Sequence, residues 1–180
     1  IISALFGYGQ FSESSVLNSA KALYFFSLGL PAFAMIKVFS NFFFANHDTK
    51  TPFYISLISV VLNILISVYF FKSIGFIIIP IATTISSWFN SITLFLFLKK
   101  RNLFSFNNIF INRIFKIAFS SILMGLFFNY LMIIFDEQLS FENSLKSIYL
   151  ILSVILGLGF YLFTSYLIKA FQLEDIKLKY

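Results

Sequence analysis

One lysine lies deep inside a long apolar stretch of this chain, where its charge could bind an anionic group. Lys37 precedes Asn46, the start of a polar connection, by nine residues, so about 13 Å of helix separates the two. An ammonium group at that depth in a membrane is costly unless it faces protein or water. Its helical neighbours are small or polar apart from Leu30: Ser27, Ala34 and Asn41. Two interpretations remain open, a cation lining a polar cavity that takes an anionic group, or a lysine held by a neighbouring helix or left neutral.

Two asparagines lie on stripes of small polar side chains in the next two apolar stretches. Asn63 shares its stripe with Ser56, Ser59 and Ser67, and Asn90 shares its stripe with Thr83, Ser87 and Ser91. Small and polar residues bring helices together in lipid, so helix packing is one interpretation, and Gly125 and Gly157 fit it too. The alternative is that Asn63 and Asn90 line a cavity. The sequence does not separate these interpretations.

The connection 46–52 is the densest polar cluster of the chain. Thr51 can cap the following helix, with Pro52 at its first position, where the missing N–H costs nothing. Asp48 can bond within the loop or pair with a nearby basic residue. His47 is the only histidine and cysteine is absent, so we expect no metal site.

The sequence offers little that could catalyse a reaction. It has no G-x-S-x-G, no Gly-rich phosphate loop and no carboxylate pair inside an apolar stretch. We therefore expect a membrane protein that is not an enzyme and that uses no cofactor.

The elements that must position these residues are membrane helices. The 180 residues are 59% hydrophobic and only 11% charged, and they include 28 Phe. Soluble domains carry roughly a quarter charged residues, so this composition excludes a cytosolic enzyme, a nucleic-acid module and a disulfide-rich secreted scaffold. The net charge of +6 does not indicate nucleic acid, because the basic residues lie at the ends of apolar stretches.

The uncharged stretches predict an all-α membrane protein of five antiparallel transmembrane helices, preceded by the end of an earlier one. About 20 apolar residues cross a hydrocarbon core. The predicted helices are at about 22–45, 53–71, 75–98, 114–135 and 145–169. We expect a first part, 1–102, with three of these helices, and a second, 103–180, with a cytoplasmic linker and two. Because the chain opens on Ile1 without a leader, we expect it to be a piece of a longer protein.

The basic residues predict the orientation. Nine of them would share one side and three the other if the spans alternate: Lys50, Lys99, Lys100, Arg101, Arg113, Lys116, Lys169, Lys177 and Lys179, against Lys21, Lys72 and Lys146. The positive-inside rule then places the C-terminus in the cytoplasm. Interfacial basic residues such as Lys99, Lys100 and Arg101 can contact anionic membrane lipids, and a role as topological anchors explains them equally well.

A resemblance to a known family covers nearly the whole chain. The run GLPAFAMIKVFSNFFFANHDTKTPFYISLISVVLN resembles the MurJ (MviN) family of lipid II flippases in the MOP exporter superfamily. Trp88-Phe89-Asn90-Ser91, the basic end Lys99-Lys100-Arg101 and the opening Leu5–Phe11 with Ser12-Glu13 continue the likeness. It is most specific at Gly29-Leu30-Pro31, Lys37-Val38 and Asp48-Thr49-Lys50-Thr51-Pro52.

The resemblance implies a fold of fourteen helices in the bacterial inner membrane, of which this chain would supply the last five. Three would complete the second lobe and two would form a lipid-facing groove. The implied function is translocation of lipid II, the undecaprenyl-pyrophosphate-linked peptidoglycan precursor, for cell-wall synthesis, with cell-wall synthesis proteins as possible partners. Lys37 matches the family lysine, and Asp48, Thr49, Lys50, Thr51 and Pro52 match its cytoplasmic loop motif. Asn41 departs from the family, which often has proline there.

Two other functions stay open at this stage. Another MOP-type exporter of lipid-linked oligosaccharide or polysaccharide would share the helix count and polarity. A non-transporting membrane scaffold would have no need of Lys37. Intramembrane arginines in upstream helices would favour the lipid II flippase over the other exporters.

Overall fold

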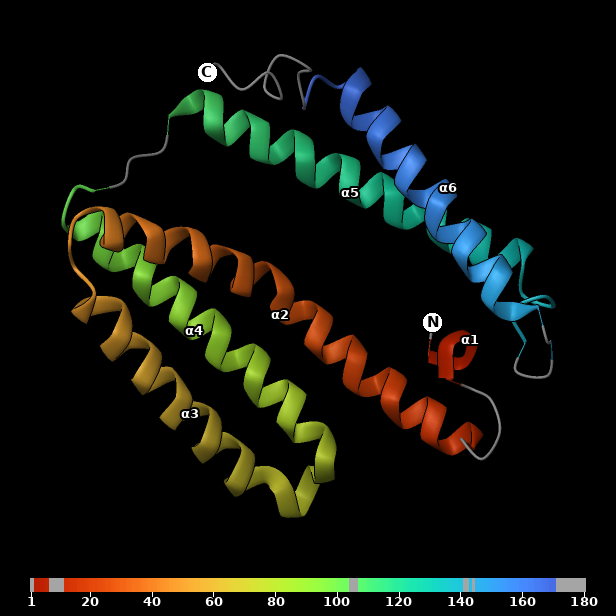
Figure 1. The fold of residues 1–180 in the computed structure, drawn as a ribbon, viewed down its shortest axis with the longest axis horizontal. Coiled ribbons are helices and arrows are strands. Elements are labelled where there is room, and N and C mark those ends of the chain that lie inside the picture. Colours follow the sequence, from red (N-terminus) through yellow and green to blue (C-terminus); the bar gives the residue numbers. More distant parts are fainter. Residues whose placement is uncertain (1, 7–11, 104–106, 141–142, 144, 171–180) are drawn as a thin grey trace. The chain divides into compact units, whose positions relative to one another are not determined.

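The computed structural model describes residues 2–6, 12–103, 107–140, 143 and 145–170, and within these ranges the chain is helical without strands (Figure 1). The helices, in order, are α1 (Ile2–Phe6), α2 (Glu13–Ala45), α3 (Lys50–Ile74), the short 3-10 helix η1 (Gly75–Ile77), α4 (Ile78–Lys100), α5 (Asn108–Ile134) and α6 (Lys146–Leu167).

Four stretches of the described chain are long and apolar enough to cross a membrane: Glu13–Ala45, Lys50–Lys100, Ile111–Ile134 and Lys146–Leu167. The second stretch includes α3, η1 and α4, which the sequence divides into two predicted spans at Gly75. Gly75 has φ 74°, a conformation that favours glycine, and the chain reverses direction there (Figure 1). The all-helical membrane class predicted from the sequence is confirmed.

α2 and α5 begin well before the predicted spans, because hydropathy marks only the part of a helix that is suited to lipid. α2 begins at Glu13 rather than at about 22, since Ser12 Oγ accepts a hydrogen bond from the Ser15 N–H at 3.3 Å and caps the helix. Parts of the predictions lie outside the described residues, namely 7–11 of the opening segment, 104–106 of the linker, and Lys177 and Lys179 of the orientation count.

The chain divides into two compact units, and residues 17–105 form the one that holds most of the predicted site. In it, α4 lies between α2 and α3 (Figure 1). Its apolar core joins all three helices and consists of Phe39, Phe43, Ile55, Leu94 and Leu98. Phe43, Leu94 and Leu98 are fully buried.

The other unit comprises residues 1–16 and 106–180, with α5 and α6 packed along each other. The rings of Phe127 and Phe160 stack between these helices, with centroids 4.3 Å apart. The predicted division into 1–102 and 103–180 as functional parts stays a prediction.

Both units present large apolar side chains on their outer surfaces. Val68, Tyr69 and Ile133 are 71%, 79% and 71% exposed. A soluble protein rarely exposes apolar patches of this extent, whereas acyl chains solvate them well. The surface therefore suits lipid.

Candidate functional site

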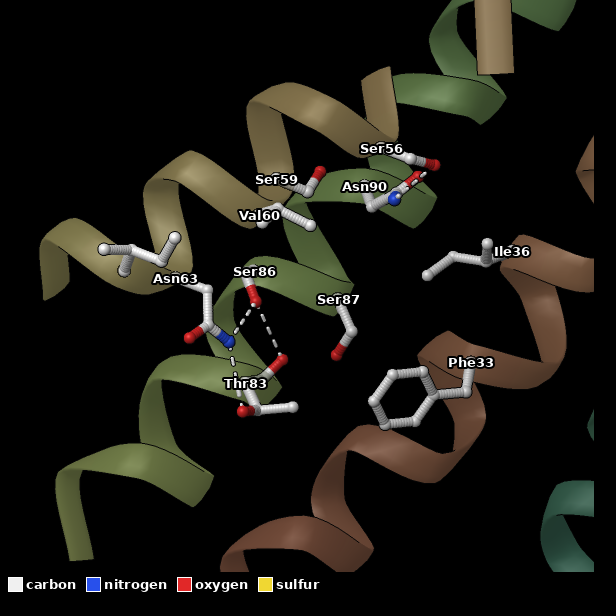
Figure 2. Close-up of a pocket in the computed structure, with 11 residues that line it drawn as sticks. Phe33, Ile36, Ser56, Ser59, Val60, Asn63, Thr83, Ser86, Ser87 and Asn90 are labelled. Atoms are coloured by element: carbon white, nitrogen blue, oxygen red, sulfur yellow. Dashed lines mark hydrogen bonds between the residues drawn. The ribbon is translucent and has the colours of Figure 1, made fainter. Parts of the chain in front are cut away.

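A pocket of about 350 Å³ lies among α2, α3 and α4, and its walls differ in chemistry. Phe33 and Ile36 of α2 form an apolar wall, and they face small polar side chains from the other two helices (Figure 2). The polar lining residues are Ser56, Ser59 and Asn63 of α3 and Thr83, Ser86, Ser87 and Asn90 of α4.

Asn63 is the centre of a hydrogen-bond network that joins α3 to α4. Its Nδ2 donates to Thr83 Oγ1 at 3.1 Å and to Ser86 Oγ at 3.2 Å (Figure 2). Its Oδ1 accepts from Ser67 Oγ at 3.4 Å. The side chain of Asn63 therefore both holds two helices together and forms part of the pocket wall, so the two interpretations of its stripe are compatible.

Asn90 lines the same pocket from α4, and it is 6% exposed. Its Nδ2 donates to Ser56 Oγ at 3.3 Å, while its Oδ1 is buried without a hydrogen-bond partner. The pocket thus offers neutral amide and hydroxyl groups. Among the described residues, no three His, Asp or Glu side chains gather in a way that could hold a metal ion.

Lys37 and Asn41 lie on a different surface of α2. Both are exposed, and neither lines the pocket. The stripe that the sequence assigned to Lys37 is exposed along its whole length in this chain: Ser27, Leu30, Ala34, Lys37 and Asn41. The structure therefore brings Asn63 and Asn90 together and leaves Lys37 and Asn41 on an open face of the unit.

The loop motif is held by a residue that the sequence analysis treated only as a basic helix end. Asp48 accepts hydrogen bonds from the Thr51 N–H at 3.0 Å and from Thr51 Oγ1 at 2.6 Å. Arg101 forms a salt bridge with Asp48, and its Nη2 donates to Thr51 Oγ1 at 3.0 Å. The Arg101 guanidinium also lies over the ring of Phe43, 5.7 Å from its centroid.

These contacts stabilise the charged form of the Asp48 carboxylate. The two hydrogen bonds from Thr51 and the neighbouring Arg101 lower the pKa of Asp48 from 3.8 to about 2. The loop between α2 and α3 is thereby tied to the end of α4. The sequence does contain one indication of this contact. If the helices before and after residue 75 are antiparallel, the end of the second one, where Arg101 lies, is at the same end of the unit as Asp48.

The two glycines predicted for helix packing have different surroundings. A Cβ on Gly157 would lie 3.3 Å from Phe128 Cδ2, so α6 approaches α5 closely there. A Cβ on Gly125 would meet nothing within 4 Å, so its packing role stays a prediction. Gly157 also lines an apolar pocket of about 310 Å³ between α5 and α6, with Met124, Phe128, Val154, Leu158 and Tyr161.

Comparisons with known proteins identify the family of the chain. The family model described as "Lipid II flippase MurJ" matches residues 1–171. Proteins named "Probable lipid II flippase MurJ" from Thermotoga maritima, Rickettsia prowazekii and Rhizobium tropici are 34%, 28% and 29% identical to this chain over 176, 180 and 179 residues. The matches cover 98%, 97% and 98% of this chain but 34%, 35% and 34% of those relatives, so the chain spans about a third of their length.

The family and the apolar helices together indicate a multi-pass membrane protein. The match covers far more than half of the chain, and it includes both the pocket among α2, α3 and α4 and the Asp48 loop. The chain belongs to the lipid II flippase MurJ family.

Proposed function

We propose that this chain is the C-terminal part of a transporter that moves lipid II across the bacterial inner membrane. The observation that carries the proposal is the family match over residues 1–171, supported by relatives whose names state a lipid II flippase. The proposal includes lipid II itself, an undecaprenyl-pyrophosphate-linked precursor, as the substrate.

In this proposal α3 and α4 each cross the membrane, which gives five crossings from α2 to α6. α3 has 25 residues and α4 has 23, so each is long enough for a core of about 30 Å. The basic end Lys99, Lys100 and Arg101 and the Asp48 loop would then share the cytoplasmic side. The helices alternate in direction, and the C-terminus is cytoplasmic.

The task of such a transporter is to shield a polar, anionic headgroup while the lipid chain stays in the membrane. The exposed stripe of α2 that bears Lys37 would face the water-filled interior of the complete protein, and its ammonium group would attract the pyrophosphate. Asn63 and Asn90 would hold the α3–α4 wall behind it. The apolar pocket between α5 and α6 would lie in the groove for the lipid chain.

The proposal is tested with a chimera in which this chain replaces the matching third of the Thermotoga maritima relative. The chimera is expressed in cells depleted of their own lipid II flippase, and lipid II exposed on the outer leaflet is measured by its accessibility to an added degrading enzyme. We expect growth and outer-leaflet lipid II to return with the chimera. If the protein is inserted and abundant but lipid II stays inside, the proposed function is wrong.

The same chimera distinguishes the two other functions. An exporter of a different lipid-linked saccharide would leave lipid II inside while the other glycolipid reaches the outer leaflet. A non-transporting scaffold would restore translocation of neither lipid, and Lys37→Ala would leave its function in the cell unchanged.

A further inference from the structure

A pocket of about 290 Å³ lies at one end of the α5–α6 pair, in the unit that comprises residues 1–16 and 106–180. The two helices pack along each other (Figure 1), and the pocket is near the beginning of the apolar part of α5 and at the end of α6. We call it the α5–α6 end pocket, and its lining residues are Ile117, Tyr161, Leu162, Ser165 and Ala170.

The turn that ends α6 forms one wall of this pocket. Lys169 has φ 54°, and its N–H donates to the carbonyl of Tyr166 at 3.1 Å. The N–H of Ala170 donates to the carbonyl of Ser165 at 2.9 Å, which completes a common helix-ending turn. Ala170 is buried in the wall and Lys169 is exposed beside it in the chain. The ammonium group of Lys169 is therefore available to a group that lies at the rim of the pocket.

The buried polar group of the α5–α6 end pocket is the hydroxyl of Ser165. Ser165 is 4% exposed, and its Oγ has no hydrogen-bond partner among the described residues. The two other buried hydroxyls of α6 are satisfied, since Ser153 Oγ donates to the carbonyl of Tyr149 at 2.8 Å and Thr164 Oγ1 donates to carbonyls of its own helix. A buried hydroxyl without a partner is destabilising, so native proteins rarely keep one. Ser165 therefore indicates a ligand that brings a hydrogen-bond acceptor.

Positive charge gathers at the same end of the two helices. Lys116 is half-buried and precedes the lining residue Ile117, and Lys169 is exposed at the turn after α6. Neither ammonium group has an acidic partner in the part of the chain that the structure describes. The acidic residues Asp136 and Glu137 follow α5, so they lie at its other end. The pocket is thus apolar inside and positive at its rim.

These features fit an anionic phospholipid better than a free anion. The walls are aliphatic or aromatic apart from the Ser165 hydroxyl, so the buried part of the ligand must be largely apolar. The volume is near the lower limit of small-molecule sites, about 300 Å³, so it takes only the glycerol esters and the beginning of an acyl chain. Ile117 and Leu162 are exposed at the rim, so the acyl chains can continue along the apolar surface of the unit. Lysines near the membrane surface attract anionic lipids.

We propose that the α5–α6 end pocket is a binding site for an anionic phospholipid. The phosphate binds the ammonium groups of Lys116 and Lys169, and the Ser165 hydroxyl donates to a carbonyl oxygen of the glycerol esters. The bound lipid joins the end of α6 to α5 and is not the lipid that is transported. The proposal goes beyond the proposed function and does not depend on it.

Native mass spectrometry tests the site, because it counts bound lipids and gives their dissociation constants. The 180-residue chain and the chimera are each titrated with dioleoyl phosphatidylglycerol and with the zwitterionic phosphatidylethanolamine of the same acyl chains. We expect one phosphatidylglycerol to bind about tenfold more tightly than phosphatidylethanolamine. Equal dissociation constants for the two phospholipids would overturn the proposal, as would a chimera that binds neither.

Two competitors separate the phospholipid from other anions. Inorganic phosphate has no apolar part, and undecaprenyl phosphate has no glycerol esters, so neither should displace phosphatidylglycerol at equal concentration. Displacement by inorganic phosphate would make the pocket a site for free anions. Displacement by undecaprenyl phosphate would assign it to the transported class of lipid. Either result overturns the proposal.

Variants assign the binding to the named groups. Lys116→Gln with Lys169→Gln should weaken phosphatidylglycerol binding about 30-fold, and Ser165→Ala should weaken it about fivefold. Lys72→Gln removes an exposed charge from the other unit, and Ser153→Ala removes a buried hydroxyl that is bonded within its own helix. Both controls should bind phosphatidylglycerol as the parent does.

An unchanged affinity in the lysine double variant or in Ser165→Ala would overturn the proposal. If the double variant does not insert, Leu162→Trp gives a second test, because it fills the pocket from the rim and leaves both charges in place. It should abolish the preference for phosphatidylglycerol, and a preference that persists would overturn the site. The titrations measure binding without transport, so the site can fail while the proposed function stands, and the reverse.

Discussion

Replacing Lys37 with leucine should make the insertion of α2 into a membrane more favourable and should abolish the transport of lipid II. Lys37 lies about 13 Å along the helix from the polar loop, near the middle of a core of about 30 Å. A lysine at the centre of a membrane helix costs about 2.5–3.5 kcal/mol on insertion scales, and a leucine gains a few tenths. Lys37→Leu should therefore favour insertion of α2 by about 3–4 kcal/mol, roughly 100-fold or more in the equilibrium constant.

Two assays measure the gain in membrane insertion and the loss of transport separately. Insertion of a segment containing residues 20–45 is measured by glycosylation mapping, and translocation is measured with the chimera. Lys37→Leu should raise insertion and abolish outer-leaflet lipid II, while Lys37→Arg, which keeps the charge, should retain part of the activity. Lys21→Leu is the control on the same helix, and it should preserve transport because Lys21 lies near the predicted outer end.

A Lys37→Leu chimera that translocates lipid II as well as the parent would refute this reasoning. Lys37 would then be held by polar atoms of a neighbouring helix, or its amino group would be neutral, as in the second interpretation of this residue given above. An unchanged insertion efficiency would contradict the depth assigned to Lys37.

Three further predictions concern the contacts around the pockets and the loop. Gly157→Leu should destabilise the α5–α6 pair by about 1–3 kcal/mol, because the new side chain would collide with the ring of Phe128. Thermal unfolding in detergent should show this loss of stability. Gly159→Leu, with open space around the position, should show none. Asn63→Leu removes two interhelical hydrogen bonds and should cost about 1 kcal/mol, measurable by steric trapping in bicelles; an unchanged free energy of unfolding would mean the network contributes nothing. Because the pKa of Asp48 is lowered from 3.8 to about 2, the stabilisation of the loop is fully present above pH 3.8 and is lost as the pH falls towards 2. Amide hydrogen exchange of the loop should follow this transition, and Asp48→Asn should remove the pH dependence. A midpoint above pH 3.8 would contradict the contact with Arg101.

The sequence predicts the helical membrane class well because the physics that decides it is local. Apolar stretches bounded by Lys50, Lys72, Lys99 and Lys116 are visible as uninterrupted runs. Helix ends are less accessible to this reasoning, since a helix can continue into water wherever a residue such as Ser12 caps it. The start of α2 at Glu13 is the clearest case.

The sequence predicts residues of the site only where the side chains that identify them lie on one face of a single helix. Asn63 and Asn90 stand out as amides inside apolar runs, and the structure places them on one pocket. The partner of Asp48 is different: Arg101 lies more than 50 residues away in the sequence, so only the return of α4 alongside α2 and α3 reveals it. Which surface of α2 faces the interior depends on protein beyond this chain's two units.

Water access to position 37 tests the central claim most directly. In a version of the chimera from which every cysteine of the Thermotoga maritima part has been removed, Lys37→Cys is treated with a charged thiol reagent that dissolves only in water. Val61→Cys, exposed on α3 away from the pocket, serves as the comparison. We predict rapid labelling at position 37 and none at position 61. Labelling of position 37 only by a lipid-soluble reagent would place the side chain among acyl chains and contradict the account.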